Sequence, residues 1–418
     1  MTRVYLHTFG CKANQYDTEV VRQALEDRGA RIVDSPSAAD HAVVNTCAVT
    51  HVSEAKMRGL VRRLARENRT IRTVVMGCAA ALDRGALARL GNVVRVVQGA
   101  DPVSVLDALG FRADGVAQGL RSFARGSRAW LKIQDGCDEH CTFCATTLAR
   151  GANRSRAWDA IRREAELLSA SHAEIVLTGV HIGGYGRDLA SGEDLATLVE
   201  RLVRTVPAVR FRLSSVEATE VDHRLVALME GVPDRLAPHL HAPLQSGSDR
   251  VLKRMGRHWY TAATYRTRIE RIAARVPTLG LGADVMVGFP GETEADHRAT
   301  VSLVRDLPFT YLHVFPYSER SGTAAPRLGP AADAAVTRQR SRELRELATE
   351  KGVAYRATRD GGRADVVRLR RGSGRLEGVT EDYLMVFSDT RMPLPARFAA
   401  SLALEDDGTL SARALSRA

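Results

Sequence analysis

Six cysteines constrain what this chain can fold into more than any other feature of its sequence. They fall into two sets, a triplet spaced Cys-x3-Cys-x2-Cys at Cys137, Cys141 and Cys144, and three lone residues at Cys11, Cys47 and Cys78. An even count in a secreted chain would suggest three disulfides. We expect a cytoplasmic protein instead, because glycine and cysteine at positions 10 and 11 precede any signal-peptide core. A reducing compartment favours metal binding or catalysis.

The triplet favours an iron–sulfur site. Three thiolates on one short loop can hold three corners of an iron–sulfur cube. With no fourth cysteine nearby, the fourth iron is left open for a substrate or cofactor. A zinc site is the alternative, but structural zinc takes four protein ligands, often as paired Cys-x2-Cys units. His140 could be the fourth, although a loop histidine between two cysteines more often faces solvent.

Each lone cysteine follows a short apolar segment that we interpret as a strand. Cys11 comes after the strand expected at 4–7, Cys47 after 42–46, and Cys78 after 73–77. In an open parallel sheet, the loops after such strands meet in one crevice. One buried thiol is usually inert, but three at matching strand ends predict a second open cluster.

The pattern of apolar residues predicts an α/β protein with three parts. Residues 1–108 alternate strands with helices at 17–28, 53–67 and 84–90, which is typical of a small doubly wound α/β domain. Residues 109–128 lack periodicity and are interpreted as a linker. Residues 129–355 contain six candidate strands, at 130–134, 174–178, 210–214, 239–243, 281–287 and 311–316, and a long helix near 333–355 that we expect to close their barrel. Residues 356–418, with short strands at 366–369, 384–387 and 400–404, predict a small all-β module.

The charge of the chain is strongly positive. Sixty Lys and Arg residues against 49 Asp and Glu leave a net charge of +11. A solvated basic surface and a polyanionic partner both explain this excess, since basic side chains neutralise phosphates. Residues 319–375 hold thirteen arginines against seven acids. The least balanced part of this segment supplies our candidates for RNA phosphate contact: Arg363, Arg368, Arg370, Arg371 and Arg375.

The triplet, with Phe143 just before its last cysteine, resembles the signature of the radical S-adenosylmethionine enzymes. In that superfamily the open iron chelates the amino and carboxylate groups of S-adenosylmethionine, whose reductive cleavage yields a 5′-deoxyadenosyl radical. The resemblance implies an open, partial (β/α)6 barrel, and six candidate strands agree with it, short of the eight in a closed barrel.

The whole chain resembles the methylthiotransferases, a family within that superfamily. The motifs that carry this likeness include Gly10-Cys11-Lys12-x-Asn14, Asn45-Thr46-Cys47, Gly77-Cys78 and the segments 175–186 and 284–293. The family usually has a proline before the Arg-Gly that follows the triplet; this chain keeps Arg150-Gly151 without the proline. The resemblance implies an N-terminal cluster domain, the radical barrel and a C-terminal TRAM-like RNA-binding domain.

The resemblance also implies the cofactors and a set of site residues. Two [4Fe-4S] clusters are expected, one on Cys11, Cys47 and Cys78 and one on Cys137, Cys141 and Cys144, together with S-adenosylmethionine as methyl donor and radical source. No catalytic residue is assigned beyond these ligands. Positions at strand ends suggest a cofactor pocket made by Phe143, Gly179, Ser214, Ser215, Glu217, Gln245 and Asp284. Capping and turn roles are the alternative for the serine and aspartate residues.

Three substrates compete within the family. The segments 178–186, 214–219 and 313–323 look most like the MtaB-type branch, which methylthiolates carbon 2 of N6-threonylcarbamoyladenosine at tRNA position 37. The alternatives are isopentenyl-adenosine at the same position and an aspartate of a ribosomal protein. The implied partners are a tRNA anticodon stem-loop, an electron donor such as flavodoxin or ferredoxin, and a sulfur source; no membrane is expected.

Overall fold

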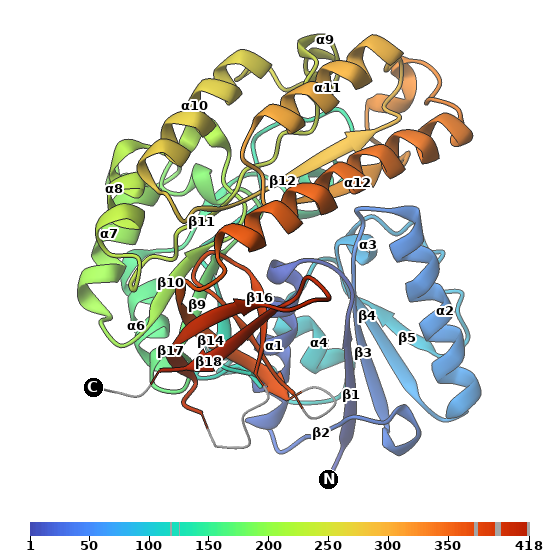
Figure 1. Ribbon diagram of the computed structural model, residues 1–418. Helices are drawn as coiled ribbons and strands as arrows, with labels where there is room; N and C mark the ends of the chain where they lie inside the picture. The colour runs from blue at the N-terminus through green and yellow to red at the C-terminus, as the bar shows by residue number, and fades with distance from the viewer. Residues whose placement is uncertain (118, 125, 372–374, 389–393, 416–418) are drawn as a thin grey trace.

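The computed structural model describes residues 1–117, 119–124, 126–371, 375–388 and 394–415. Figure 1 shows an N-terminal α/β part, a larger half-barrel of strands and outer helices, and a small C-terminal β module. The predicted α/β fold class is confirmed. Among the described residues, none of the helices is both long and apolar enough to cross a membrane.

The N-terminal part is built on five parallel strands in the order β2-β1-β3-β4-β5. The strands are β1 (Arg3–Thr8), β2 (Arg31–Val33), β3 (His41–Thr46), β4 (Arg72–Gly77) and β5 (Val93–Val96). The helices are α1 (Lys12–Glu26), α2 (His51–Glu67), α3 (Cys78–Ala81) and α4 (Pro102–Ala108). The strand order reverses between β1 and β3, which is where doubly wound sheets open a crevice at their carboxyl ends.

The prediction of a helix at residues 84–90 was wrong. That segment forms turns, because the Asp83 carboxylate accepts hydrogen bonds from the backbone N–H groups of Gly85, Ala86 and Leu87 at 3.0 to 3.2 Å. An aspartate that binds these groups offers the backbone an alternative to the helix. The short helix α3 instead follows β4 at once, beginning at Cys78.

Six parallel strands form the central half-barrel. They are β6 (Arg128–Lys132), β9 (Glu174–Thr178), β10 (Arg210–Leu213), β11 (His239–His241), β12 (Gly280–Val287) and β13 (Tyr311–Pro316). Ladders join β6-β9-β10 and β11-β12-β13, and a bridge between Ser215 and His241 joins the two halves. In the described part of the chain, β6 and β13 do not pair with each other, so the barrel is open, as predicted.

Helices cover the outside of this half-barrel. They are α6 (Trp158–Ser169), α7 (Leu195–Thr205), α8 (His223–Gly231), α9 (Asp249–Arg254), α10 (Ala262–Arg275), α11 (Glu294–Asp306) and α12 (Ala334–Thr358). The loop after β6 also carries a small pair of strands, β7 (Gln134–Asp135) and β8 (Arg154–Ser155), and the short helix α5 (Thr146–Arg150). The long helix α12 was expected to close the barrel. It packs along β13, where the Arg345 guanidinium donates to the Val314 carbonyl at 3.0 Å, and does not bridge β13 to β6.

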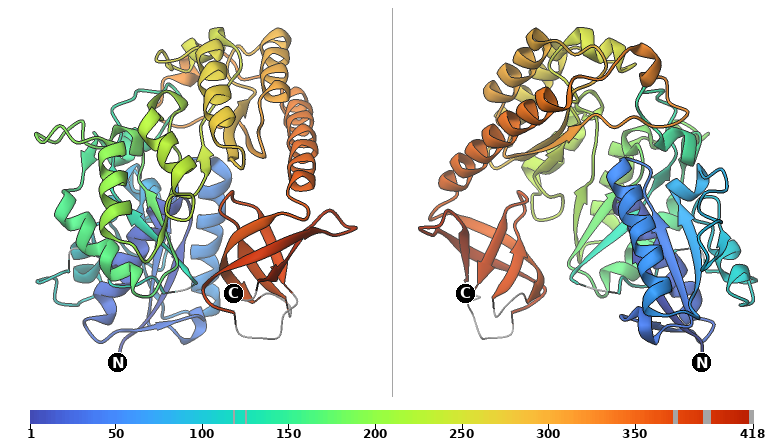
Figure 2. Two further views of the ribbon diagram at one scale, coloured as in Figure 1. Left: turned by 60° about the vertical axis from the view of Figure 1, so that its left-hand side comes forward. Right: turned by 90° about the vertical axis from the view of Figure 1, so that its right-hand side faces the viewer.

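The C-terminal module is a closed barrel of five strands, reached through α12 (Figure 2). The strands are β14 (Arg363–Arg371), β15 (Leu376–Val379), β16 (Met385–Ser388), β17 (Arg397–Leu404) and β18 (Leu410–Ala414). Strands β15 and β18 were not predicted. The expected domain boundaries 1–108, 109–128, 129–355 and 356–418 remain our proposal, with position 355 falling inside the last turn of α12.

The C-terminal module packs against the amino ends of the barrel strands. Arg210 at the start of β10 pairs with Asp365 at 2.8 Å, and Arg212 donates to the carbonyl oxygens of Thr380 and Glu381 at 2.9 Å. At the start of β12, a Cβ on Gly280 would lie 1.9 Å from the Asp382 carbonyl oxygen, so a glycine is required there. The module therefore seals the end of the barrel opposite to the cysteine triplet.

Candidate cluster and cofactor site

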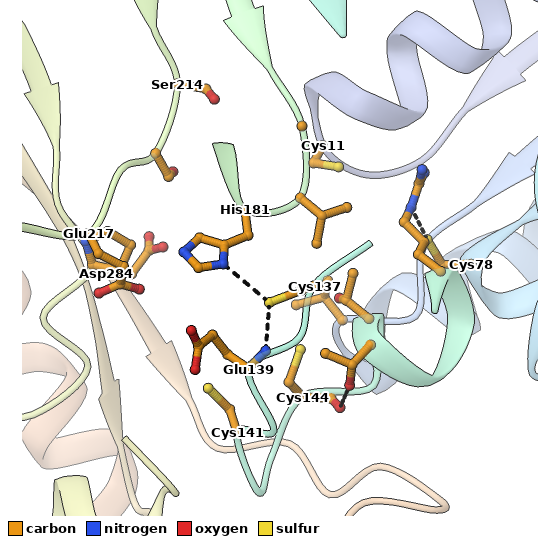
Figure 3. A pocket seen from close by; sticks show the side chains of 18 of the residues that line it. Cys11, Cys78, Cys137, Glu139, Cys141, Cys144, His181, Ser214, Glu217 and Asp284 are labelled. Atoms are coloured by element: carbon orange, nitrogen blue, oxygen red, sulfur yellow. Dashed lines mark hydrogen bonds between the residues drawn. The ribbon is translucent and has the colours of Figure 1, made fainter. Parts of the chain in front are cut away.

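All six cysteines line one cavity of about 380 Å³ between the N-terminal sheet and the barrel. The same wall contains every residue that we expected in the cofactor pocket: Phe143, Gly179, Ser214, Ser215, Glu217, Gln245 and Asp284. In the view of Figure 3, Glu217 and Asp284 lie on the opposite side of the triplet from Cys11 and Cys78. The fold therefore brings together two sets of thiols and a polar wall from positions more than 270 residues apart along the chain.

The N-terminal cysteines gather at the crevice of the parallel sheet. Asn14 in α1 organises their loops, because its amide nitrogen donates to the carbonyl oxygens of Phe9 and Thr46, each at 2.9 Å. Its amide oxygen lies 4.0 Å from the Cys11 sulfur and 3.8 Å from the Cys78 sulfur. The Asn14 side chain thus lies next to two of the three thiols and is hydrogen-bonded to Thr46, the residue before the third, Cys47.

Glycine at position 10 is a condition of this close approach. Its φ of +112° is unfavourable for other residues, and a Cβ there would lie 2.8 Å from the Asn14 amide nitrogen and 3.1 Å from the Cys47 Cβ. A side chain at position 10 would push the Cys11 and Cys47 loops apart.

The triplet lies on the loop between β7 and α5, and helix α9 holds this loop in place. Thr142 donates its backbone N–H to the Met255 carbonyl and its hydroxyl to the Arg254 carbonyl, both at 2.9 Å. The ring of Phe143 packs edge-on against Phe289, with 6.5 Å between the centroids. His140 is exposed and does not line the cavity, as expected for a loop histidine that faces solvent.

Four of the six sulfur atoms have an N–H donor close by. The pairs are Cys47 with the Val49 backbone at 3.5 Å, Cys78 with Arg150 at 3.2 Å, Cys137 with the Glu139 backbone at 3.4 Å and Cys141 with Arg257 at 3.6 Å. Hydrogen bonds to the sulfurs tune iron–sulfur sites, so such donors suit cluster ligands. The two sets therefore fit two iron–sulfur clusters, each with three cysteine ligands.

Burial opposes deprotonation of the Cys78 and Cys141 thiols. It raises the pKa of Cys78 to about 11 and that of Cys141 to about 12. Arg150 and Arg257 act in the opposite direction on the two pKa values but do not outweigh burial. Loading of such a site releases protons.

Arg150 connects the two sets of cysteines. Besides Cys78, its guanidinium contacts Asp17 of α1 at 2.8 Å, the Asn14 amide oxygen at 2.6 Å and Asp135 at 3.0 Å. Arg150 ends α5, the helix that occupies the segment in which the expected proline is absent. Arg150, which follows the triplet, thus connects the triplet loop to the N-terminal cysteine site.

Both acidic residues of the expected cofactor pocket have partners within the protein. The Glu217 carboxylate accepts hydrogen bonds from Arg257 at 2.5 Å, and Asp284 lies 3.1 Å from His241 and 3.3 Å from His313. Gly179 is needed for packing as well, because a Cβ there would lie 2.7 Å from the Gln134 carbonyl oxygen. Ser214 and Ser215 also line the cavity, and within the described residues neither hydroxyl has a hydrogen-bond partner in the protein.

The arginines expected to contact RNA lie on the C-terminal module. Arg363 and Arg375 are exposed, whereas Arg368 donates to the Leu394 carbonyl at 2.8 Å. The side chains of Arg370 and Arg371 lie outside the described part of the structure. Other arginines of the segment 319–375 serve packing: Arg320, Arg340 and Arg359 are buried in ion pairs with Glu54, Glu292 and Glu381.

Arg150, His181 and Arg257 are among the cavity residues that sequence reasoning missed. Arg150 and His181 lie in segments that the resemblance had singled out, so their motifs offered a signal. Arg257 offered none: it is 116 residues from the Cys141 sulfur that it contacts, and only the fold brings the two together.

Comparison with known proteins gives the family. Residues 3–99 match the model described as "Uncharacterized protein family UPF0004", and residues 131–304 match the radical SAM superfamily. A threonylcarbamoyladenosine tRNA methylthiotransferase, MtaB, of Bacillus subtilis is 36% identical over 85% of this chain and 82% of its own length. The chain belongs to the radical S-adenosylmethionine methylthiotransferases. It is an enzyme that transfers sulfur-containing groups, and its cofactors are S-adenosylmethionine and two [4Fe-4S] clusters.

Other relatives of this methylthiotransferase are named for a different substrate. A tRNA-2-methylthio-N(6)-dimethylallyladenosine synthase of Methylobacillus flagellatus is 33% identical, with 85% of each chain covered. Among solved structures, the radical S-adenosylmethionine methyltransferase TsrM of Kitasatospora setae superposes with a TM-score of 0.57 over 90% of this chain and 81% of its own. At 15% sequence identity this likeness concerns the fold alone.

Proposed function

We propose that this methylthiotransferase acts on carbon 2 of N6-threonylcarbamoyladenosine at position 37 of tRNA. The observation that supports this substrate is the similarity to MtaB enzymes of Bacillus subtilis and Thermotoga maritima, at 36% and 35% identity over 85% of the chain. The dimethylallyl-adenosine branch is the second candidate, because a relative of that branch is 34% identical over 90% of the chain. The proposed compartment is the cytoplasm, where tRNA is modified.

We further propose Cys11, Cys47 and Cys78 as ligands of the auxiliary cluster and Cys137, Cys141 and Cys144 as ligands of the radical cluster. Bound cofactors supply the methyl group, the sulfur and the 5′-deoxyadenosyl radical that an unactivated adenine C–H position requires. The protein contributes position: Arg150, Arg257 and the backbone of Glu139 orient the sulfur atoms, and the cavity brings both sets to one adenine.

The rest of the cavity wall is proposed to hold S-adenosylmethionine. Ser214, Ser215 and Gln245 present uncharged polar groups, and Phe143 presents a ring beside the triplet. Glu217 and Asp284 each have a basic side chain of the protein as partner, so we assign them the role of fixing the pocket's shape and polarity.

RNA is proposed to span the open barrel and the C-terminal module. The anticodon stem-loop presents single-stranded bases, which is the form of RNA that proteins read by stacking and base contacts. Arg363, Arg368, Arg370, Arg371 and Arg375 are proposed phosphate contacts. An electron donor such as flavodoxin or ferredoxin and a sulfur source complete the proposed partners.

The substrate is tested with two anticodon hairpins and the anaerobically purified enzyme. Position 37 carries N6-threonylcarbamoyladenosine in one hairpin and N6-dimethylallyladenosine in the other, and the nucleosides are analysed by mass spectrometry. We expect the methylthio product from the first hairpin. Product from the dimethylallyl hairpin alone would overturn the proposed substrate. Loss of 2-methylthio-N6-threonylcarbamoyladenosine from tRNA of a deletion strain is the matching result in cells.

Single cysteine variants test the two ligand sets. Cys141→Ala is expected to stop formation of 5′-deoxyadenosine, whereas Cys47→Ala leaves this cleavage in place and abolishes thiolation. Iron analysis accompanies both, with about eight irons per chain expected for the wild type, four for each cube. A Cys47→Ala enzyme that thiolates at the wild-type rate would contradict the assignment.

A further inference from the structure

Lys12 occupies a position between the two sets of cysteines. It follows Cys11, begins helix α1, is half-buried, and lines the same cavity as the six thiols. It shares this cavity with the barrel residues Ser215, Gln245 and Asp284. Burial above all lowers the pKa of His239 in β11, and the charges of Arg212, His241 and Lys12 lower it further. This lysine therefore reaches from the N-terminal domain toward the inside of the half-barrel.

Among the described residues, the charge of Lys12 is not balanced by an acidic side chain. Each of the other cationic side chains on the cavity wall contacts a carboxylate: Arg150 contacts Asp17, Arg257 contacts Glu217 and His181 contacts Glu220. The carboxylates of the wall are likewise engaged: Glu139 with Arg187, Glu217 with Arg257 and Asp284 with His241. Within the described residues, Lys12 forms neither an ion pair nor a side-chain hydrogen bond.

The position is also unfavourable for a cation on local grounds. The first turn of a helix carries the positive end of the helix dipole and prefers acidic side chains, yet the first turn of α1 contains none. A residue that breaks a local rule without a compensating contact in the fold points to function. A half-buried, unpaired ammonium beside a dipole of the same sign is suited to an anionic ligand.

The candidate substrates differ in this one property. The threonylcarbamoyl group ends in a free carboxylate, whereas the dimethylallyl group is an uncharged hydrocarbon. Building on the proposed function, we propose that the Lys12 ammonium binds the carboxylate of the threonylcarbamoyl group and so selects this nucleoside. Two other anions could occupy the same place, the carboxylate of S-adenosylmethionine and a phosphate of the RNA, and the experiment separates them.

The test compares two hairpins that differ by one charge. Position 37 carries either N6-threonylcarbamoyladenosine or its methyl ester, and fluorescence anisotropy measures binding to the cluster-loaded enzyme. We expect the wild type to bind the acid about tenfold more tightly than the ester, as for a charge-assisted hydrogen bond. Lys12→Met should lose that preference by weakening only the acid, and Lys12→Arg should keep most of it. Lys56→Met, which removes an exposed lysine of α2, is the matched control and should resemble the wild type.

Several results would overturn the proposal. Equal binding of acid and ester by the wild type would do so without any variant, which covers the case of a Lys12→Met protein that loads too little iron. Equal weakening of both hairpins by Lys12→Met would indicate a phosphate contact. An increased KM for S-adenosylmethionine in RNA-free cleavage, with the acid-to-ester ratio unchanged, would indicate the cofactor carboxylate. Failure of the proposed function is distinct, because it appears as product from the dimethylallyl hairpin alone.

Discussion

At the scale of single residues, Arg150 shows how one side chain assembles a site from two domains. It is mostly buried, and its guanidinium is shared among a thiol, an amide and the carboxylates of Asp17 and Asp135. Burying charges is unfavourable unless their partners are complete. Removal of Arg150 would leave Asp17 and Asp135 with Lys132 as the cation that contacts both, at 2.5 and 2.9 Å.

We predict that Arg150→Met destabilises the protein and weakens retention of the auxiliary cluster. Breaking a buried ion pair costs about 3–5 kcal/mol when the remaining charge is uncompensated; Lys132 still contacts both carboxylates, so we expect a smaller loss, and Cys78 loses its N–H donor. Thermal unfolding and iron content after desalting measure the two effects. Arg154→Met removes an exposed arginine four residues away and serves as the control. An Arg150→Met protein with full iron and an unchanged Tm would refute this role.

At the scale of elements, strand β13 presents a row of rings at the open edge of the barrel. His313 and Phe315 are exposed on the same face, with 6.1 Å between their centroids, and His241 of β11 lies 5.0 Å from His313. Exposed rings at the edge of an open barrel provide stacking surfaces of the kind that bind unpaired bases.

We predict that Phe315→Ala weakens tRNA binding at least about fivefold, because stacking on an aromatic side chain contributes about 1–3 kcal/mol per base. Val353→Ala removes an exposed apolar side chain from α12 and should leave binding unchanged. Filter binding with unmodified and position-37-modified tRNA measures the effect. Wild-type affinity in the Phe315 variant would show that bases do not stack on β13.

Elements with continuous apolar runs were the predictable ones. Strand β9 is buried along its whole length, and its apolar residues define it in the sequence. Strand β2 was missed because it has only three residues. Strand β15 was missed because only two of its four residues, Leu376 and Val379, are apolar. The cysteines and strand-end polar residues of the site could be read from local position, whereas the contact of Arg257 with Cys141 depends on tertiary structure.

At the scale of the whole molecule, a buried cluster of charges joins the barrel to the C-terminal module. Glu174 is fully buried and contacts Arg128 at 2.7 Å, Arg210 at 2.7 Å and Arg212 at 2.9 Å. Burial alone would raise the pKa of Glu174, but Arg212, Arg128 and Arg210 hold it well below its usual value. Because this pKa is depressed, the stabilisation is complete above the unfolded-state pKa of about 4 and is lost only in stronger acid.

We predict that Glu174→Gln lowers the free energy of unfolding by about 3–5 kcal/mol, because three neighbouring arginines would lose the carboxylate that they share and Asp365 would remain for Arg210 alone. Urea denaturation at pH 7 and pH 5.5 should give the same difference between wild type and variant. The exposed pair Arg63–Glu67 offers the control, and Glu67→Gln should change stability by less than about 1 kcal/mol. A difference that disappears between pH 7 and pH 5.5 would contradict the pKa argument.

The contact between the C-terminal module and the amino ends of the barrel strands has a consequence for how the two parts evolved. The C-terminal module meets the barrel through Arg210, Arg212 and the space left by Gly280, rather than through a loose tether. A gene that discarded this module in one step would have left these two arginines with Glu174 but without Asp365 and the carbonyl oxygens of Thr380 and Glu381. Homologues that lack the module should therefore carry smaller or uncharged residues at 210 and 212 and have no need for glycine at 280, so these three positions record whether the two parts evolved together.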